Sequence, residues 1–94
     1  MNQSDDNEMI KSETRRILDI VADLSQNDVK KDVLETEIIA HSGLPAIEVR
    51  NYLNELEWLN LAKESSVPRP SHAEFRLWSV TEKGLQERSR HDLT

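Results

Sequence analysis

The chain has 94 residues, of which 36% are hydrophobic and 32% charged; this composition is typical of one small globular domain without a second lobe to close an active-site cleft. It contains no cysteine, which excludes disulfides, a thiolate nucleophile and a cysteine-based zinc site. No apolar run approaches the roughly 20 residues that a membrane-spanning helix needs, and no secretory leader is evident, so we expect a cytoplasmic protein without membrane contact.

The net charge of −6 is unevenly spread along the chain. Residues 1–35 carry five Lys or Arg against nine Asp or Glu, residues 36–62 one against four, and residues 63–94 six against five. Affinity for nucleic acid depends largely on cations that displace counterions from phosphates. The C-terminal third therefore has the charge balance that best suits a nucleic acid.

The first predicted element is an amphipathic helix over residues 9–26. Its apolar residues recur at separations of three, four and seven positions, which places them on one stripe of a helix. Residues 1–7, which precede the domain (8–94), are polar and acidic without this periodicity, and we predict a disordered tail there. After the helix, residues 33–34 are a candidate short strand that joins a later hairpin. The apolar stripe consists of Met9, Ile10, Ile17, Leu18, Ile20, Val21 and Leu24.

Two further helices are predicted over residues 36–42 and 45–59, joined by a tight turn. Thr36 suits the N-cap of the first helix, because its hydroxyl can accept an early backbone N–H. Gly43 provides the permissive backbone that a helix C-cap needs, and Pro45 suits the opening of the second helix because it has no N–H to leave unpaired.

The second of these helices has one apolar face, formed by Val49, Tyr52, Leu53 and Leu56. Residues three and four positions apart lie on the same side of a helix, so this face is expected to pack on the rest of the domain. Asn60 is expected to end the helix in the left-handed conformation that few residues other than glycine tolerate.

A β-hairpin is predicted over residues 61–80, with a tip rich in proline and serine. Because side chains alternate across a strand, Trp78 and Val80 lie on one face and Phe75 and Leu77 on the other. We assign Trp78 and Val80 to the core, since Val80 directly precedes the last predicted helix. Phe75 and Leu77 are then expected on the outer face.

A short helix over residues 81–91 completes the chain. The order of helix, helix, turn, helix, hairpin and helix is that of a winged helix-turn-helix, a mainly α (α+β) fold with a three-helix core, a β-hairpin wing and a short C-terminal helix. Folds of this kind usually bind double-stranded DNA with the third helix in the major groove.

Three segments carry a family resemblance. Residues 38–53 resemble a helix-turn-helix with a Leu-Ala pair, a Gly-Leu-Ser turn and a Val then a Leu down the recognition helix. Residues 56–61 resemble a Leu-x-x-x-Gly-Leu ending, and residues 78–84 a Leu-Thr-x-x-Gly that follows the wing. Together they resemble the winged-helix domain of MarR-like and ArsR-like prokaryotic transcriptional regulators. The resemblance implies a DNA-binding transcriptional regulator that acts as a homodimer.

The chain also departs from that family pattern. Ile39 stands where a small residue usually lets two helices approach, and Asn60 replaces the usual glycine. The long flanking helices that build MarR-like dimers have no counterpart in the sequence. These departures leave subfamily, dimer geometry and effector pocket open.

If the helix over 45–59 enters a major groove, the side chains turned away from its apolar face read the bases. Ile47 suits a thymine methyl, Asn51 or Asn54 a bidentate contact with adenine, and Arg50 a guanine or a phosphate. Cations of the hairpin suit phosphates or a minor groove. The predicted DNA-binding residues are Ala46, Ile47, Arg50, Asn51, Asn54, Lys63, Arg69, His72 and Arg76.

The alternative interpretation is a winged helix that binds another protein. Its polar third helix would then be a solvated face, and a protein partner would contact Phe75 and Leu77 on the outer hairpin face. Charged hairpins also protect sheet edges and keep proteins soluble, so both interpretations of the wing stay open. Because the net charge is negative, DNA is favoured over a protein partner only by a modest margin.

The sequence predicts no cofactor and no enzymatic activity. His41, His72 and His91 are widely spaced and form no cluster with metal-ligand spacing. The neighbouring carboxylates at residues 55 and 57 have no base or nucleophile close by in the sequence, and residues two apart on a helix do not face each other.

Overall fold

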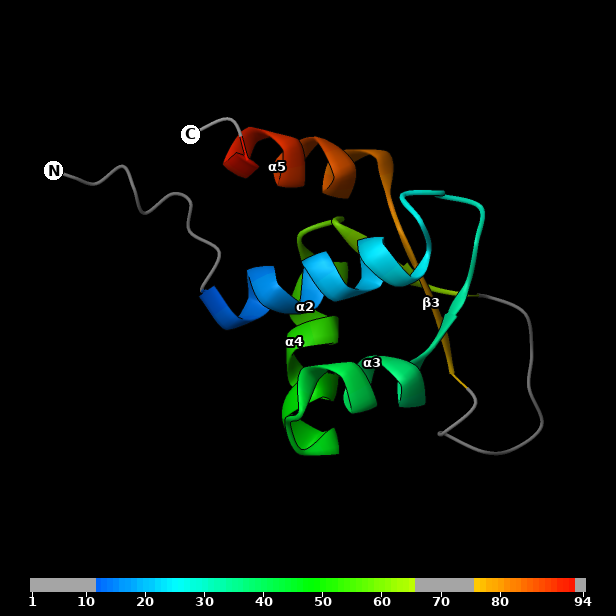
Figure 1. Ribbon diagram of the computed structural model, residues 1–94, viewed down its shortest axis with the longest axis vertical. Helices are drawn as coiled ribbons and strands as arrows, with labels where there is room; N and C mark the ends of the chain where they lie inside the picture. Colours follow the sequence, from blue (N-terminus) through cyan, green and yellow to red (C-terminus); the bar gives the residue numbers. More distant parts are fainter. Residues whose placement is uncertain (1–11, 66–75, 93–94) are drawn as a thin grey trace, which may run out of the picture.

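Helix α2 is the element around which the other helices and the sheet are arranged (Figure 1). In the computed structural model of the chain, residues 12–65 and 76–92 are described, with side chains up to residue 89. Figure 1 shows α2 between α5 on one side and α3 on the other, with β3 at one end. The elements are α2 (Ser12–Leu24), β1 (Val33–Leu34), α3 (Glu35–Ser42), α4 (Ala46–Trp58), β2 (Ala62–Glu64), β3 (Leu77–Val80) and α5 (Glu82–Asp92).

The three strands form one antiparallel sheet in the order β1-β3-β2. Val33 pairs with Trp78, and Ala62 pairs with Val80. The predicted third strand is therefore confirmed, and it joins the hairpin on the free side of β3. Three helices, a turn between α3 and α4, this sheet and a C-terminal helix make the fold a winged helix-turn-helix, as the sequence predicts.

The core forms where α2, α4 and the sheet meet. Trp78 and Val80 are fully buried, which confirms their predicted place, whereas Leu77 on the other strand face is half-buried. Phe75, like Met9 and Ile10, lies outside the described residues. The buried apolar residues are Ile17, Leu18, Val21, Ala22, Val33, Ile38, Val49, Leu53, Leu56, Leu61, Ala62, Trp78 and Val80.

The start of α3 differs from the sequence prediction. Thr36 is not the N-cap, because the helix already begins at Glu35 and the extended residue before it makes no side-chain cap. Strand pairing explains the shift, since the backbone N–H of Glu35 donates to the carbonyl oxygen of Arg76 at 2.8 Å. The last ladder bond thus satisfies the first of the helix N–H groups that have no partner inside the helix.

The turn between α3 and α4 uses glycine and proline nearly as predicted. Gly43 ends α3 in the left-handed conformation (φ 73°), and its N–H donates to the carbonyl of Ile39 at 3.1 Å. Pro45 stands one residue before α4 instead of inside its first turn, and its carbonyl accepts the N–H groups of Glu48 and Val49. Asn60 is confirmed in the left-handed region, with φ 66°.

Helix α2 ends two residues before the predicted limit at 26. Gln26 and Asn27 both have positive φ, at 58° and 60°. The N–H of Asn27 donates back to the carbonyl of Ala22 at 2.8 Å, a closing bond of the Schellman type. This left-handed turn redirects the chain toward β1.

Helix α5 is held by its first turn and by charge pairs with α2. Thr81 caps the helix, because its hydroxyl accepts the N–H of Gly84 at 2.9 Å and donates to the carbonyl of Asn60 at 2.6 Å. Farther along, Glu87 pairs with Arg15 at 3.0 Å. Arg88 contacts Asp19 and Asp23 on α2 and Asn27 in the turn after it.

We expect Gly84→Ala to destabilise the domain although alanine is the better helix former. A Cβ at residue 84 would collide with the backbone carbonyl oxygen of Leu61 and lie 3.0 Å from Cγ2 of Val80. That carbonyl accepts the N–H of Thr81 and cannot move freely. Overpacking of this kind costs about 1–3 kcal/mol, occasionally more. Thermal melts with Gln86→Ala, an exposed position on the same helix, as control check this, and equal melting temperatures would contradict the close approach.

Candidate nucleic-acid interface

The outward side of α4 is a stripe without charge. Helix α4 packs inward through Val49, Leu53 and Leu56, which are fully buried. On the opposite side, residues 47, 51, 54 and 58 follow one another at four, three and four positions, the spacing of one helical face. We call this set the α4 stripe; it consists of Ile47, Asn51, Asn54 and Trp58, all exposed.

Four of the predicted base-reading residues therefore have the exposure that the prediction requires. Ala46, Ile47, Asn51 and Asn54 are all exposed, and Ile47 has 67% of its surface free. A helix of 13 residues extends about 20 Å, longer than the width of a major groove of about 12 Å. The α4 stripe can therefore face base edges along its N-terminal half.

Acidic side chains flank the α4 stripe. Glu48 and Glu57 are exposed on α4, while Glu55 is half-buried. The carboxylate of Glu55 accepts a hydrogen bond from the buried hydroxyl of Thr14 at 3.0 Å, which ties α4 to α2. Glu48 lies in the first turn, where its charge stabilises the helix through the helix dipole. These charges lower the attraction of α4 for phosphates without occupying the stripe.

Arg50 is not the solvent-facing side chain that the sequence analysis assumes. Its Nε donates to Oε2 of Glu35 at 2.8 Å, and its side chain is 26% exposed. Glu35 is only 3% exposed, and its Oε1 accepts the indole N–H of Trp78 at 2.9 Å. Arg50 is thus part of a buried polar link between α4, the start of α3 and β3.

The wing contributes fewer free cations than its sequence suggests. Lys63 on β2 is exposed, but Nη1 of Arg76 lies 3.6 Å from the carboxylate of Glu64 on the neighbouring strand. That pair is loose and about one third exposed, so it competes weakly with a phosphate. Arg69 and His72 lie outside the described residues.

Sequence reasoning missed three residues of this face. Trp58 has 83% of its surface exposed and continues the α4 stripe, a position that the helical spacing already indicates. Glu35 has no sequence signal, because its burial depends on how α3, α4 and β3 meet. Arg16 of α2 donates from Nη2 to the carbonyl of Ser42 at 2.8 Å and adds a half-exposed cation beside the turn.

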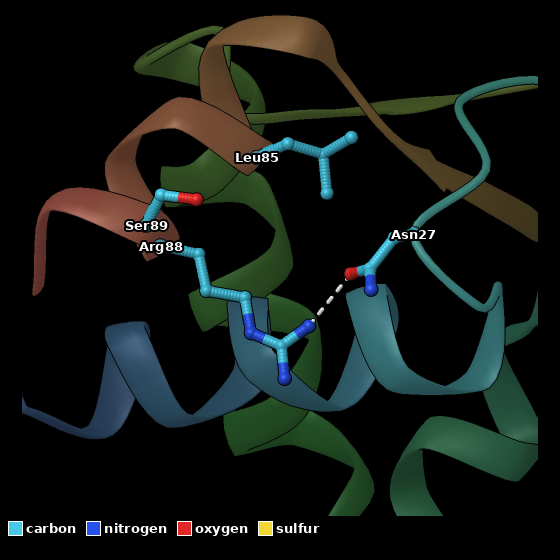
Figure 2. Close-up of a pocket in the computed structure, with 4 residues that line it drawn as sticks. All are labelled: Asn27, Leu85, Arg88 and Ser89. Carbon is cyan, nitrogen blue, oxygen red and sulfur yellow. Dashed lines mark hydrogen bonds between the residues drawn. The ribbon is translucent and has the colours of Figure 1, made fainter. Parts of the chain in front are cut away.

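A shallow hollow between α5 and the turn after α2 shows no independent binding chemistry. It is lined by Asn27, Leu85, Arg88 and Ser89, as Figure 2 shows. Among these four described residues Arg88 carries the charge, and its guanidinium is already bound by Asp19, Asp23 and Asn27. The hollow is therefore part of the contact between α2 and α5.

The described part of the chain contains neither a metal-binding cluster nor a membrane-spanning helix. Within residues 12–65 and 76–92, no group of three or more His, Cys, Asp or Glu side chains is arranged to hold a metal ion. In the same ranges no helix has the length and apolarity to cross a membrane.

Comparison with solved structures assigns the fold. The chain has the winged-helix fold, and its structural neighbours include MarR-family regulators at low sequence identity. Lactococcus lactis ZitR, a zinc-responsive MarR family member, superposes with a TM-score of 0.67 at 22% identity, over 99% of this chain and 58% of its own. A ZitR mutant in complex with DNA gives 0.67 at 20% identity, over 99% and 57%. S. aureus MepR, also a mutant, gives 0.63 at 15% identity, over 89% and 64%.

These likenesses concern the fold alone. The chain spans less than two thirds of the length of each of these three solved chains. No protein-family model and no curated protein sequence matches it. The structural likeness is therefore carried by the arrangement of helices and wing, with little sequence in common.

We expect Arg50→Ala to destabilise the domain, in contrast to a surface substitution. Its loss would leave the carboxylate of Glu35 buried with a neutral donor as its remaining side-chain partner. We expect a cost of roughly 2–4 kcal/mol, toward the low end for a broken buried pair because Arg50 is partly solvated. Chemical denaturation of this variant beside Asn54→Ala, which is exposed on the same helix, is the measurement. A cost within about 0.5 kcal/mol, as at ordinary surface sites, would show that the pair contributes little.

Proposed function

We propose that the protein binds double-stranded DNA in a sequence-specific way, as a small transcriptional regulator. In this proposal α4 enters the major groove and the hairpin of β2 and β3 lies along the backbone. The observation that carries the proposal is the α4 stripe, an uncharged and exposed helix face with two asparagines near its middle. The fold's likeness to MarR-family regulators, one of them a mutant of ZitR in complex with DNA, supports it.

The chemistry of the α4 stripe favours base contacts over phosphate contacts. An asparagine amide can donate to N7-side acceptors and accept from the amino group of adenine, forming a bidentate pair. Asn51 and Asn54 are both exposed, and Ile47 can contact a thymine methyl group from the same stripe. Specific affinity would then come from α4, while Lys63 and Arg76 would contact phosphates.

Because the domain is acidic, we expect weak and salt-sensitive binding. Few phosphates can be neutralised by each protomer, so the log–log slope of affinity against salt should be on the order of −3 to −6 for a dimer. Asn51→Ala and Asn54→Ala should each cost roughly 1–3 kcal/mol on a selected duplex and leave random duplex unchanged, whereas Arg76→Ala should weaken both equally.

Fluorescence anisotropy with labelled duplexes, from low to physiological salt, measures these effects after a site has been selected from a random pool. Lys83→Ala, an exposed cation on α5, is the matched control for the loss of one positive charge outside the interface. If the Asn51→Ala and Asn54→Ala variants kept full affinity for the selected site, α4 would not be the helix that contacts the bases. Failure to bind any duplex at low salt would end the proposal.

A second candidate function is protein binding through the same helix. Trp58 and Ile47, with 83% and 67% of their surfaces exposed, are the large hydrophobic side chains that stand out on the described surface. Both belong to the α4 stripe, and Glu48, Glu55 and Glu57 flank them. The hairpin face is the weaker candidate, because Leu77 is half-buried. A partner for α4 would be apolar in its centre and cationic at its rim.

Homodimer formation is also part of the proposal. Substitution of Trp58 tests whether α4 forms the dimer contact. Two-fold pairing places two recognition helices about 34 Å apart, on successive major grooves. Sedimentation equilibrium at tens of micromolar should give about twice the protomer mass of 10.9 kDa. Trp58→Ala should leave that mass and the affinity for a selected site unchanged, because groove-reading helices use their N-terminal residues.

The same experiment identifies the alternative. A dimer that Trp58→Ala dissociates would be paired through α4, which could not then lie in a groove. A monomer mass at every concentration would remove the dimer and leave low-affinity binding to a single half-site. Because Trp58 is 83% exposed, we expect this variant to fold, and far-UV circular dichroism is the check.

A further inference from the structure

The carboxylate of Glu35 joins the recognition helix to the wing. Its two oxygens accept two donors from separate elements, Nε of Arg50 on α4 at 2.8 Å and Nε1 of Trp78 on β3 at 2.9 Å. Trp78 is fully buried and Glu35 is 3% exposed. The backbone N–H of Glu35 also donates to the carbonyl of Arg76, at the start of the wing strand. One residue therefore contacts α4 and β3 at the same time.

An ion pair this well buried is a poor way to gain stability alone. Removing a carboxylate from water is costly, and apolar side chains of similar volume often stabilise a core as well or better. The pair does fix an orientation, because hydrogen bonds from two fixed elements hold the carboxylate of Glu35 in one position. The arrangement therefore constrains the side chain of Arg50 more than packing would.

Arg50 has donors left over for a ligand. A guanidinium carries five N–H groups in one plane, and the bond to Glu35 uses the single N–H on Nε. No residue in the described ranges accepts from its two Nη atoms, and neither atom is buried without a partner. Holding Nε fixes the plane of the group, so the Nη edge is presented in one direction beside the α4 stripe.

We propose that Glu35 is a positioning residue for DNA binding, which orients the Nη edge of Arg50 toward a backbone phosphate at the side of the major groove. This inference rests on the proposed function and refines the sequence prediction, which left guanine and phosphate open for Arg50. A planar fork suits the oxygens of a phosphate, and phosphate contacts fix the register in which a helix meets the bases. Through Trp78 the same carboxylate holds the wing strand relative to α4.

Glu35→Gln separates this role from simple electrostatics by the sign of its effect. The substitution removes one negative charge from a protein of charge −6, which by itself should strengthen binding to DNA. If Glu35 orients Arg50, the affinity should instead fall by roughly tenfold, the effect of one charge-assisted hydrogen bond, on selected and random duplex alike. Arg50→Lys keeps the charge but has no fork, and should fall by a similar factor.

A double-mutant cycle completes the test. Because both substitutions break the same link, Glu35→Gln combined with Arg50→Lys should bind no more weakly than Arg50→Lys alone. Ile38→Val, a core substitution on α3 without a polar contact, controls for general loss of stability. In ¹⁵N NMR spectra, the indole N–H of Trp78 and the Nε–H of Arg50 should both shift in Glu35→Gln, with Trp58→Phe used to assign the two indoles.

The possible outcomes distinguish failure of this inference from failure of the proposed DNA binding. If the unsubstituted protein binds duplex and Glu35→Gln binds it equally or more tightly, the inference is overturned and DNA binding remains. Additive losses in the double variant also overturn it, because the two residues would then act independently. A parent that binds no duplex overturns the function and the inference together, whereas the NMR shifts would still show that Glu35 holds both donors. Should Glu35→Gln fail to fold, Arg50→Lys alone decides, and unchanged affinity for duplex overturns the role of the fork.

Discussion

The burial of one face of α4 against α2 determines what the rest of the surface can do. Val49, Leu53 and Leu56 have no exposed surface, and Thr14 of α2 binds Glu55 just beside them. A helix that is anchored along one face must present the opposite face to solvent. The α4 stripe is outward for this reason, and its composition decides between the partners that the domain can bind.

The charge of the domain and the charge of its interface have to be considered separately. A total of −6 opposes nucleic acid only to the extent that the acids lie near the contact, since exposed charges beyond about 10 Å are largely screened at ordinary salt. Asp19 and Asp23 bind Arg88 between α2 and α5, and Glu35 binds Arg50. These pairs also occupy the two arginines, so they leave the net charge unchanged, and the acids next to the contact matter most. Glu48 and Glu57 remain exposed on α4 and set the limit on its affinity for phosphates.

The elements of the fold could be predicted from the sequence because each has a local signal. Gly43 and Asn60 end helices by their tolerance of positive φ, and Trp78 and Val80 follow the alternation of a strand. Thr36 failed as a cap because α3 already begins at Glu35, whose N–H pairs with the wing strand. That bond joins residues 35 and 76, and no local pattern contains it.

The candidate site was predictable to the same extent and for the same reason. Exposure of Asn51 and Asn54 follows from helical periodicity alone. The state of Arg50 does not, because its partner Glu35 lies 15 residues away and is buried only when Trp78 covers it. Helical spacing was enough to find Trp58, which the sequence analysis missed, but its exposure of 83% depends on the absence of a neighbouring element over that end of α4 among the described residues.

The surface available for self-association sets a last constraint on the proposed dimer. Ile17 is fully buried and Ile20 packs against the core, so these two residues of the apolar stripe of α2 are used inside the protomer. Ile47 and Trp58, the large exposed apolar side chains within the described residues, both lie on α4. A dimer that keeps α4 free for DNA must therefore be held by a surface other than these two side chains. A dimer held by these two side chains would instead cover the face of α4 that is proposed to contact bases. Identifying the surface that pairs the protomers therefore also decides whether α4 can bind DNA.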